Sequence, residues 1–477
     1  MKYLLALDIG TTSVKAGLFD ERCNLVDSSI GEYLLLTPAP DRAELDPEIY
    51  WQAAVKAIKT VIQRVGIDTE HILGLTISSQ GETLIILDEN DTPLMNAIVW
   101  VDNRATKQAA ELNEQFSNDV YQVTGIPEIV PTWPACKILW LQQESPEIFN
   151  RAKKYLLVQD YLVWRFTGSF TTDASISCTT MSYDINRHEW WKHCLETIGI
   201  TADHLPQIKL AGETAGLISK EVSEITGLSV STRVILGGMD QAVGAIGAGN
   251  VAEGIISETT GAALAIQACV QDPDVDSHKV TPVYVHSVPG KYLLVPVCPT
   301  AGMALKWFKD SFFTDLSQKA SKNGTSIYKV MDEMAAAIPA GADGLTMLPH
   351  LMGAFSPFPN AAARGSFTGF TLAHGREHFI RAIIEAVAFL LRQNIESIEN
   401  AGFTVGEIRT SGGGSHSSLW NQIKADVTNR PILRLETEDS ALLGDAILAA
   451  VACGFFDSIE DACHNTVTIK ERILPGP

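Results

Sequence analysis

The polar stretch from Asp8 to Lys15 combines residue types that could hold a phosphate group. A Gly/Thr turn between two strands presents backbone N–H groups and hydroxyls to an anion, and a nearby aspartate can hold Mg²⁺, usually through water because that ion dehydrates reluctantly. The alternative is a simple hairpin turn without a ligand. The chain contains neither G-x-x-x-x-G-K-[ST] nor a clean G-x-G-x-x-G, so P-loop and Rossmann interpretations lose their main signal.

A second candidate is Asp240, which follows the glycine pair Gly237 and Gly238 and the apolar run Val234 to Leu236. A carboxylate at a strand end could accept a proton from a substrate hydroxyl, a role that contributes roughly 10²- to 10⁴-fold in rate. The same carboxylate could instead cap the helix expected from Ala242 onward. The sequence leaves both interpretations open.

Further polar groups follow other expected strands. Glycines in the stretch Ser411 to Ser415, and Gly261 after Thr260, would let the backbone approach a nucleotide and leave N–H groups for an anion, although a glycine run is usually only a loop. The stretches 78–83 and 100–104 carry polar side chains that suit a polyhydroxylated substrate. In the second of them, an Asp/Arg pair is more often a structural ion pair.

The composition limits the classes of protein that can carry these residues. With 477 residues, 46% hydrophobic and 19% charged, the chain is long enough for two or three globular domains. A formal net charge of −20 argues against nucleic acid or an anionic membrane as the main partner.

The sequence shows no targeting or membrane segment. The best apolar candidate, Ala441 to Phe456, is broken by Asp445, and the apolar run at the N-terminus is too short for a signal peptide. The eight cysteines form no C-x-x-C pair and no zinc-type cluster, which is typical of small residues in a reducing compartment. We therefore expect a cytoplasmic protein with no membrane partner.

The elements that must position the polar residues recur along the chain. Apolar runs at 3–7 and 14–19 flank the Asp8 turn and predict paired strands, and Asp46-Pro47-Glu48 predicts the start of a helix. Residues 255–266 repeat the order of apolar strand, acidic residue, Thr/Gly turn and returning strand. This repeat fits two related domains that meet in the small-residue stretch 244–254, although two hairpins can be similar by chance. Strands alternating with long amphipathic segments, notably 377–398 and 418–427, predict an α/β fold with a sheet in each half and ligands in the crevice between the domains.

Taken in order, these motifs resemble the carbohydrate kinases named for their FGGY signature, which include glycerol kinase, xylulokinase, ribulokinase and gluconokinase. The resemblance covers nearly the whole chain, and the joint order and spacing of the motifs carry it, since each motif is modest alone. The matching segments are Asp8 to Thr12, Ala97 to Arg104, Gln159 to Leu162, Thr172-Asp173, Gly237 to Gln241, Ala363 to Gly365 and Ser411 to Gly414.

The resemblance implies the two-domain actin/hexokinase-like (ribonuclease H-like) α/β fold, with a cleft between duplicated domains. It implies that residues 1–250 bind the substrate and carry the catalytic base, and that residues 251–477 bind the nucleotide. Members transfer the γ-phosphoryl group of ATP to a sugar or polyol hydroxyl, with Mg²⁺.

The resemblance also implies individual roles. Asp240 corresponds to the general base and Asp8 to the metal-side carboxylate. Lys306 and Ser417 stand where glycerol kinases carry Gln and Asn, so the residues expected near the adenine of ATP depart from the glycerol kinase pattern. The residues expected at the nucleotide are Thr11, Thr12, Ser13, Lys15, Thr260, Gly261, Gly302, Gly413 and Ser417, and those expected at the substrate are Gly81, Glu82, Asp102, Arg104, Asp240 and Gln241.

The substrate is predicted from short motifs. Residues 80–83 read Gln-Gly-Glu-Thr, which lies between the Gln-Met-His-Gly of xylulokinases and the Gln-Arg-Glu-Thr of glycerol kinases. Segments 172–184, 357–360 and 419–420 look more like the pentulose kinases. We expect a ketopentose, with xylulose first and ribulose second, and a polyol such as glycerol or erythritol, or another sugar of the family, as the alternative.

Two other classes share the scaffold. A binding or sensor protein that closes on a nucleotide without turnover predicts a defective base, whereas Asp8 and Asp240 are both present. A hydrolytic ATPase acting on protein partners predicts ATP turnover without sugar. The sequence leaves the oligomeric state open, including a homodimer.

Overall fold

The hairpin predicted around Asp8 forms in the computed structural model, which describes residues 1–273, 279–313 and 324–476. β1 (Tyr3–Ile9) and β2 (Ser13–Asp20) are mostly buried because they are apolar on both faces and the sheet is covered on both sides. β1 also pairs in parallel with β5 (Ile72–Ser79), which pairs in parallel with β14 (Arg233–Met239). The first sheet has the order β13-β14-β5-β1-β2-β3, with edge strands β13 (Thr214–Leu217) and β3 (Leu25–Glu32).

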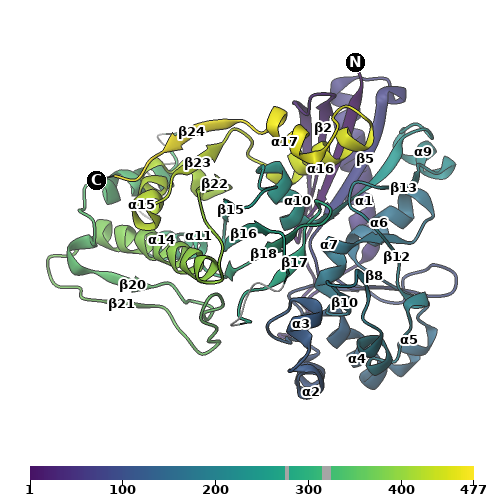
Figure 1. Cartoon of the computed structure of the whole chain (residues 1–477), viewed down its shortest axis with the longest axis horizontal. Coiled ribbons are helices and arrows are strands. Elements are labelled where there is room, and N and C mark those ends of the chain that lie inside the picture. Colours follow the sequence, from purple (N-terminus) through teal and green to yellow (C-terminus); the bar gives the residue numbers. More distant parts are fainter. Residues whose placement is uncertain (274–278, 314–323, 477) are drawn as a thin grey trace.

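The second half repeats this pairing. β15 (Ile255–Thr260) is antiparallel to β16 (Leu264–Val270) and parallel to β22 (Glu407–Ser411), which is parallel to β23 (Ile432–Leu435). The predicted duplication of an α/β unit is therefore confirmed, and Figure 1 shows the two domains side by side. The other strands of this sheet are β17 (Val283–Val285), β18 (Tyr292–Leu294), β19 (Val297–Cys298) and β24 (Ile469–Ile473).

The helices begin where local signals place them. The Asp46 side chain accepts the Glu48 N–H, Pro47 occupies the first turn, and α1 (Pro47–Val65) follows. α14 (Arg376–Asn400) and α15 (Ser418–Thr428) match the two predicted amphipathic segments to within a residue or two. No helix among the described residues is long and apolar enough to cross a membrane. The other longer helices are α2 (Thr106–Phe116), α4 (Pro134–Glu144), α6 (Val158–Thr167), α11 (Gly302–Phe312), α13 (Ile327–Ala336) and α17 (Ile459–Thr466).

Helices α10 (Asp240–Gly247) and α16 (Ser440–Ala452) cross closely between the two sheets (Figure 1). A Cβ at Gly247 would lie 1.8 Å from the Ser440 carbonyl oxygen, and a Cβ at Gly444 would lie 2.0 Å from the Val243 carbonyl oxygen. Both glycines are therefore required by close packing. α16 comes from the second half of the chain but packs on β1 and β5, so a boundary at residue 250 does not separate everything that builds the first domain.

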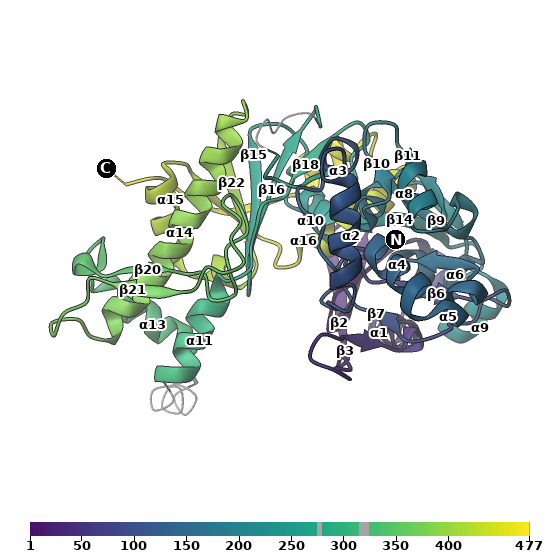
Figure 2. The same cartoon turned by 90° about the horizontal axis from the view of Figure 1, so that it is seen from below.

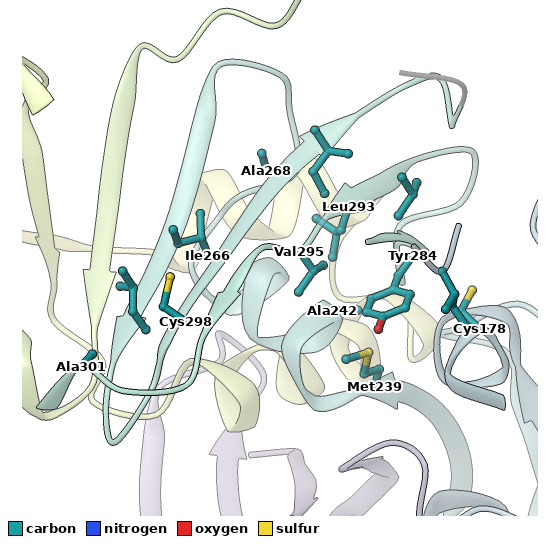
Figure 3. Close-up of a cluster of buried hydrophobic side chains, with 14 of the residues drawn as sticks. Cys178, Met239, Ala242, Ile266, Ala268, Tyr284, Leu293, Val295, Cys298 and Ala301 are labelled. Carbon is teal, nitrogen blue, oxygen red and sulfur yellow. The ribbon is translucent and has the colours of Figure 1, made fainter. Parts of the chain in front are cut away.

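The largest apolar cluster in the described chain also joins the two halves. Side chains of β16, β17 and β18 pack toward α10 and the segment around Cys178, as Figure 3 shows, and Figure 2 shows the ribbon of β16 beside α10. The Val285 N–H donates to the Cys178 sulfur at 3.3 Å, and the Val283 N–H donates to the Gly125 carbonyl at 2.9 Å. The β17–β18 hairpin of the second domain thus brings Tyr284 next to Met239, the last residue of β14 (Figure 3).

Candidate active site

Three parallel strands of the first sheet end at one edge, where the polar residues gather. The register pairs Asp8 of β1 with Ser78 of β5, and Ser78 with Gly238 of β14. Asp240 follows directly as the first residue of α10. The carboxyl ends of neighbouring parallel strands form the usual binding crevice of α/β proteins, so the predicted carboxylates Asp8 and Asp240 reach one place.

A buried polar network fixes the turn before Asp240. Gly238 has a φ of +128°, and its N–H donates to the Gln159 side-chain oxygen at 2.5 Å. The Gln159 amide donates to Asp173 at 2.7 Å, and the Ser175 hydroxyl donates to the same carboxylate at 2.5 Å while accepting the Met239 N–H at 3.0 Å. Because these partners are buried, the direction in which the chain leaves β14 is set by hydrogen bonds from α6 and α7 (Ala174–Ser177).

The Asp240 carboxyl uses only one oxygen within the protein. Its Oδ1 accepts the Gln241 N–H at 2.7 Å, and Oδ2 has no hydrogen-bond partner among the described residues. Burial raises the pKa of Asp240 to about 6, although the Gln241 hydrogen bond and Lys15 oppose the rise. The Gln241 side-chain oxygen is buried and has no partner in the described part of the chain. Asp240 therefore binds the backbone at the start of its own helix through one oxygen and leaves the other oxygen available.

The turn after Asp8 carries the predicted phosphate residues. The Lys15 ammonium lies 2.6 Å from Asp439 Oδ2 and 4.0 Å from Asp8 Oδ2. Thr12 is exposed, whereas Thr11 and Ser13 are half-buried, and Thr11 accepts a hydrogen bond from the Trp100 indole at 2.8 Å. Asp439, the N-cap of α16, was missed by the sequence analysis because nothing near it in the chain indicates a partner more than 400 residues earlier.

The Asp8 carboxyl is buried close to two other acidic side chains. Burial raises the pKa of Asp8 to about 8, Asp439 and Asp240 add to the rise, and Lys15 opposes it. Its Oδ1 is buried and has no hydrogen-bond partner among the residues that the structure describes. No group of three His, Cys, Asp or Glu side chains in the described part of the chain is arranged to hold a metal ion by itself. A divalent cation at Asp8 would therefore need water and substrate oxygens as further ligands.

Gly81 and Glu82, which the sequence analysis expects at the substrate, follow β5, and Glu82 lies within the electrostatic influence of Asp240. A Cβ at Gly81 would lie 2.8–2.9 Å from the Thr179 side chain, so this position is closed to any larger residue unless Thr179 moves. Glu82 has a φ of +54°, and its N–H donates to the Thr179 hydroxyl at 3.3 Å. Burial raises the pKa of Glu82, which Lys137 opposes and Asp240 reinforces.

Lys137 and Tyr284 also belong to this region and were missed by the sequence analysis. The Lys137 ammonium is fully buried and donates to the carbonyls of Glu82, Val99 and Ile98, at 2.8, 3.1 and 3.4 Å. Tyr284 approaches from β17. Burial raises the pKa of the Tyr284 hydroxyl well above its usual value, and the nearby Glu82 carboxylate raises it further. A lysine on a helix and a tyrosine in a short strand carry no local signal of these positions.

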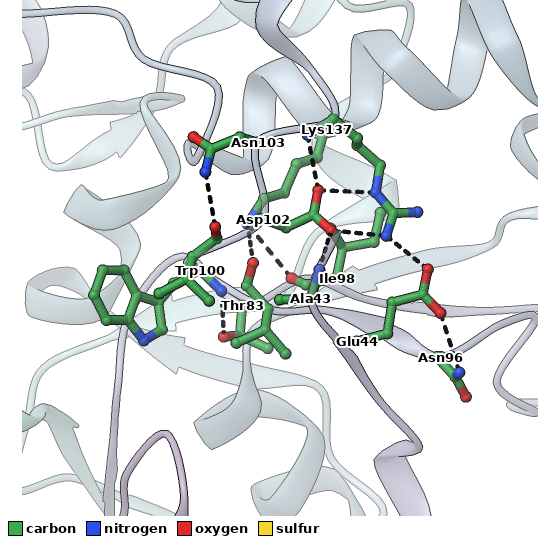
Figure 4. Close-up of polar contacts among 12 residues, drawn as sticks. Ala43, Glu44, Thr83, Asn96, Ile98, Trp100, Asp102, Asn103 and Lys137 are labelled. Carbon is green, nitrogen blue, oxygen red and sulfur yellow. Dashed lines mark hydrogen bonds and ion pairs between the residues drawn. The ribbon is translucent and has the colours of Figure 1, made fainter. Parts of the chain in front are cut away.

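Asp102 and Arg104, which the sequence analysis expects at the substrate, form a buried ion pair with each other. Asp102 is fully buried and binds the Arg104 guanidinium through both oxygens, each at 2.8 Å (Figure 4). Asp102 also accepts the Ala43 N–H at 2.7 Å, and Arg104 reaches Glu44 at 2.6 Å. The Asp102 carboxylate and the Nε and Nη2 atoms of Arg104 are engaged in this network, which is the structural ion pair that the sequence left open as the alternative.

The remaining residues expected at the nucleotide, Thr260, Gly261, Gly302, Gly413 and Ser417, lie in loops of the second domain or directly beside them. A Cβ at Gly302 would lie 2.3 Å from the Gly261 carbonyl oxygen, and one at Gly414 would lie 2.7 Å from the Thr260 Cβ. Gly413 is exposed, with nothing within 4 Å of its Cβ position. Ser417 caps α15 by accepting the Trp420 N–H at 3.0 Å. Three glycine-containing loops therefore converge, leaving a backbone cradle that side chains would fill.

Two family models match the chain, the N-terminal domain of the FGGY family of carbohydrate kinases over residues 3–247 and its C-terminal domain over residues 257–453. A xylulose kinase and a gluconokinase of Bacillus subtilis are each 31% identical to the chain. The alignment with the xylulose kinase covers 100% of this chain and 93% of that protein. The alignment with the gluconokinase covers 99% of this chain and 92% of that protein. The structure of ligand-bound xylulose kinase from Lactobacillus acidophilus superposes with a TM-score of 0.92 at 27% identity, covering 100% of this chain and 94% of that one. The fold, the converging site and these matches together show that the chain belongs to the FGGY family of carbohydrate kinases.

Proposed function

We propose that this kinase transfers the γ-phosphoryl group of ATP to a hydroxyl of a neutral ketopentose, with xylulose as the first candidate and ribulose as the second. The observation that carries the proposal is the Asp240 carboxyl, which has one oxygen free and lies beside Glu82 and the unpartnered Gln241 oxygen. In the proposed reaction, Asp240 orients the sugar hydroxyl and accepts its proton as the phosphoryl group is transferred.

The charges around Asp240 favour a neutral sugar over an acidic one. Relatives of equal identity are named xylulose kinase and gluconokinase, and gluconate carries a carboxylate that a neutral ketose lacks. Two cations in the described site are engaged, Lys137 with three backbone carbonyls and Arg104 with Asp102 and Glu44, and the third, Lys15, lies beside Asp439 on the phosphate side. Since Glu82 and Asp240 are acidic, a sugar carboxylate there would meet repulsion without a compensating charge.

The division of work between the domains is part of the proposal. Residues 1–250 would hold the sugar and the base, and residues 251–477 would hold ATP through the turn at Thr260 and Gly261, with Gly302, Gly413 and Ser417. Thr11, Thr12, Ser13 and Lys15 would face the transferred phosphate. Asp8 would hold Mg²⁺, which fits its unpartnered buried oxygen, and the ion would supply positive charge to the phosphate oxygens.

The cysteines support a cytoplasmic location for this proposed reaction. All eight are free thiols and most are buried. Reduced cysteines are typical of the cytosol, where ATP is available as the phosphoryl donor.

A substrate panel tests the proposal directly. We expect ADP release to rise strongly on addition of xylulose or ribulose, and only weakly with glycerol, erythritol or gluconate. Coupled-enzyme assays at equal sugar concentrations measure this, with the protein without sugar as the baseline. A preference for gluconate would contradict the charge argument, a preference for a polyol would contradict the ketopentose assignment, and equal turnover without sugar would indicate an ATPase.

Replacing Glu82 by glutamine is expected to raise the KM for the sugar by roughly 10- to 100-fold, the scale of one hydrogen bond to a charged group. The KM for ATP should stay the same, because Glu82 lies on the first-domain side of the site. Steady-state kinetics with either substrate varied would measure both values. Glu114→Gln, an exposed change on α2, is the matched control, and an unchanged sugar KM in Glu82→Gln would remove Glu82 from the site.

A further inference from the structure

A fully buried ion pair lies beneath the turn at Thr260. The Lys424 ammonium on α15 is 2.5 Å from Glu258 Oε1 on β15, and neither side chain has any exposed surface. Glu258 also accepts the hydroxyls of Thr410, at 2.5 Å, and Thr260, at 2.8 Å. Lys424 donates in addition to the Thr260 hydroxyl at 2.9 Å and lies 5.3 Å from the centre of the Trp420 ring. The four polar side chains therefore form one connected hydrogen-bond network.

Stability alone does not account for this cluster. Taking both charges out of water costs about as much as their attraction returns, and apolar residues of similar volume often replace a buried ion pair without loss. What the pair does provide is a fixed geometry, because each of its hydrogen bonds has a defined length and direction. The pair therefore specifies an arrangement rather than adding much to the free energy of folding.

The arrangement that it specifies involves the three chain segments of the nucleotide cradle. β15 leads into the turn at Thr260 and Gly261, and β22, which carries Thr410, leads into the loop 412–414. α15, which carries Lys424, follows its N-cap Ser417. The Glu258–Lys424 pair connects these three segments on the side away from the loops, through the hydrogen bonds to Thr260 and Thr410. The spacing of the two loops is thus set by contacts that no nucleotide would touch.

The Thr260 side chain shows how this spacing is transmitted. Its hydroxyl donates to Glu258 and accepts from Lys424, so it is directed into the protein and is not free to donate to a phosphate. In this rotamer the Thr260 Cβ and methyl group face Gly414, and a Cβ on Gly414 would lie 2.7 Å from each of them. The rotamer of Thr260 therefore sets how closely the 412–414 loop approaches the turn, and the turn offers its backbone to a ligand.

We propose that Glu258 and Lys424 are positioning residues that hold the two nucleotide loops at the spacing that ATP requires. The proposal rests on the nucleotide role assigned to these loops under the proposed function. Preorganising a binding site in this way lowers the conformational cost of binding.

The informative variant removes both charges together. Single substitutions would leave an unpaired buried charge and lose stability for that reason alone. The double variant Glu258→Leu/Lys424→Met keeps the volume apolar, and we expect it to melt close to the wild-type temperature. Its Kd for a nonhydrolysable ATP analogue, measured by calorimetry without sugar, should rise at least about tenfold, the scale seen when supporting contacts around a site are lost. The KM for ATP should rise in parallel while the KM for the sugar stays unchanged.

Thr260→Val gives a second test that does not depend on the stability of the double variant. It keeps the ion pair and the volume but removes the hydroxyl, and it should weaken binding of the analogue in the same way. The control is Arg381→Met/Glu385→Leu, which removes an ion pair of equal length on α14, outside the three segments, and should bind the analogue as the wild type does.

Wild-type affinity in the folded double variant, or in Thr260→Val, would overturn the proposal, since the cluster would then serve the fold alone. Equal weakening in the Arg381/Glu385 control would overturn it as well. The calorimetry separates this inference from the sugar assignment: a protein that binds the analogue as expected but phosphorylates no sugar refutes the proposed function and leaves the positioning role standing. A wild-type protein that binds no nucleotide refutes both.

Discussion

Asp240→Asn is expected to lower kcat by roughly two to four orders of magnitude, the contribution of a positioned general base. Asparagine has the same shape and can still accept the Gln241 N–H, so the start of α10 should be preserved. It cannot take a proton from the sugar hydroxyl. Steady-state turnover with both substrates saturating measures the loss, and calorimetry with the ATP analogue should give the wild-type Kd. Wild-type turnover in this variant would exclude Asp240 as the base.

The same carboxyl is expected to set the acid limb of the pH profile. Burial raises the pKa of Asp240 to about 6, and a base acts in its deprotonated form. The value of kcat/KM for the sugar should therefore fall as the pH drops through about 6, approaching tenfold per pH unit. The residual activity of Asp240→Asn should lack this limb, and a limb that persists would belong to another group.

Gly238→Ala is expected to lower the free energy of unfolding by about 3–5 kcal/mol, from backbone strain and a steric clash together. The φ of +128° is a conformation that side chains rarely adopt, and the new Cβ would lie 2.2 Å from the Ser175 hydroxyl oxygen and 2.6 Å from that of Ser287. Urea denaturation measures the change. The turn carries Asp240, so kcat of the folded fraction should fall as well.

Gly227→Ala is the control for this prediction. Gly227 ends α9 (Lys220–Thr226) with a φ of +82° and has nothing within 4 Å of its Cβ position. Alanine there should cost only the backbone strain, about 1–2 kcal/mol, and leave kcat unchanged. Equal destabilisation by the two alanines would show that the Ser175 and Ser287 contacts relax without cost.

The turn between β14 and α10 contains glycines, whose backbone is flexible, and buried hydrogen-bond partners that hold this backbone in one conformation. The glycines permit β14 to turn sharply into α10, and Gln159, Asp173 and Ser175 remove the freedom that glycine would otherwise retain. A general base needs such support because a small displacement of the carboxyl costs much of its effect.

The sequence determined the elements and the order of the motifs, because those depend on near neighbours. Continuous apolar runs beside the Asp8 turn are sufficient for buried strands, and Asp46 with Pro47 is sufficient for the start of α1. The repeat of the hairpin at residues 255–266 predicted the second sheet. The position of Asp240 directly after a strand and a glycine pair was likewise sufficient to predict that it lies at the edge of the sheet.

Only the tertiary structure decided which charged residues meet. Lys15 pairs with Asp439, Lys424 with Glu258, and Asp102 with Arg104. In the sequence, Lys424 and Glu258 look like ordinary surface charges of an amphipathic helix and of a hairpin. The burial of Lys424 and Glu258 results from parallel strands that pair distant segments, and the Lys15–Asp439 pair forms because α16 crosses back to the first sheet. Such long-range pairing leaves no trace in the local order of residues.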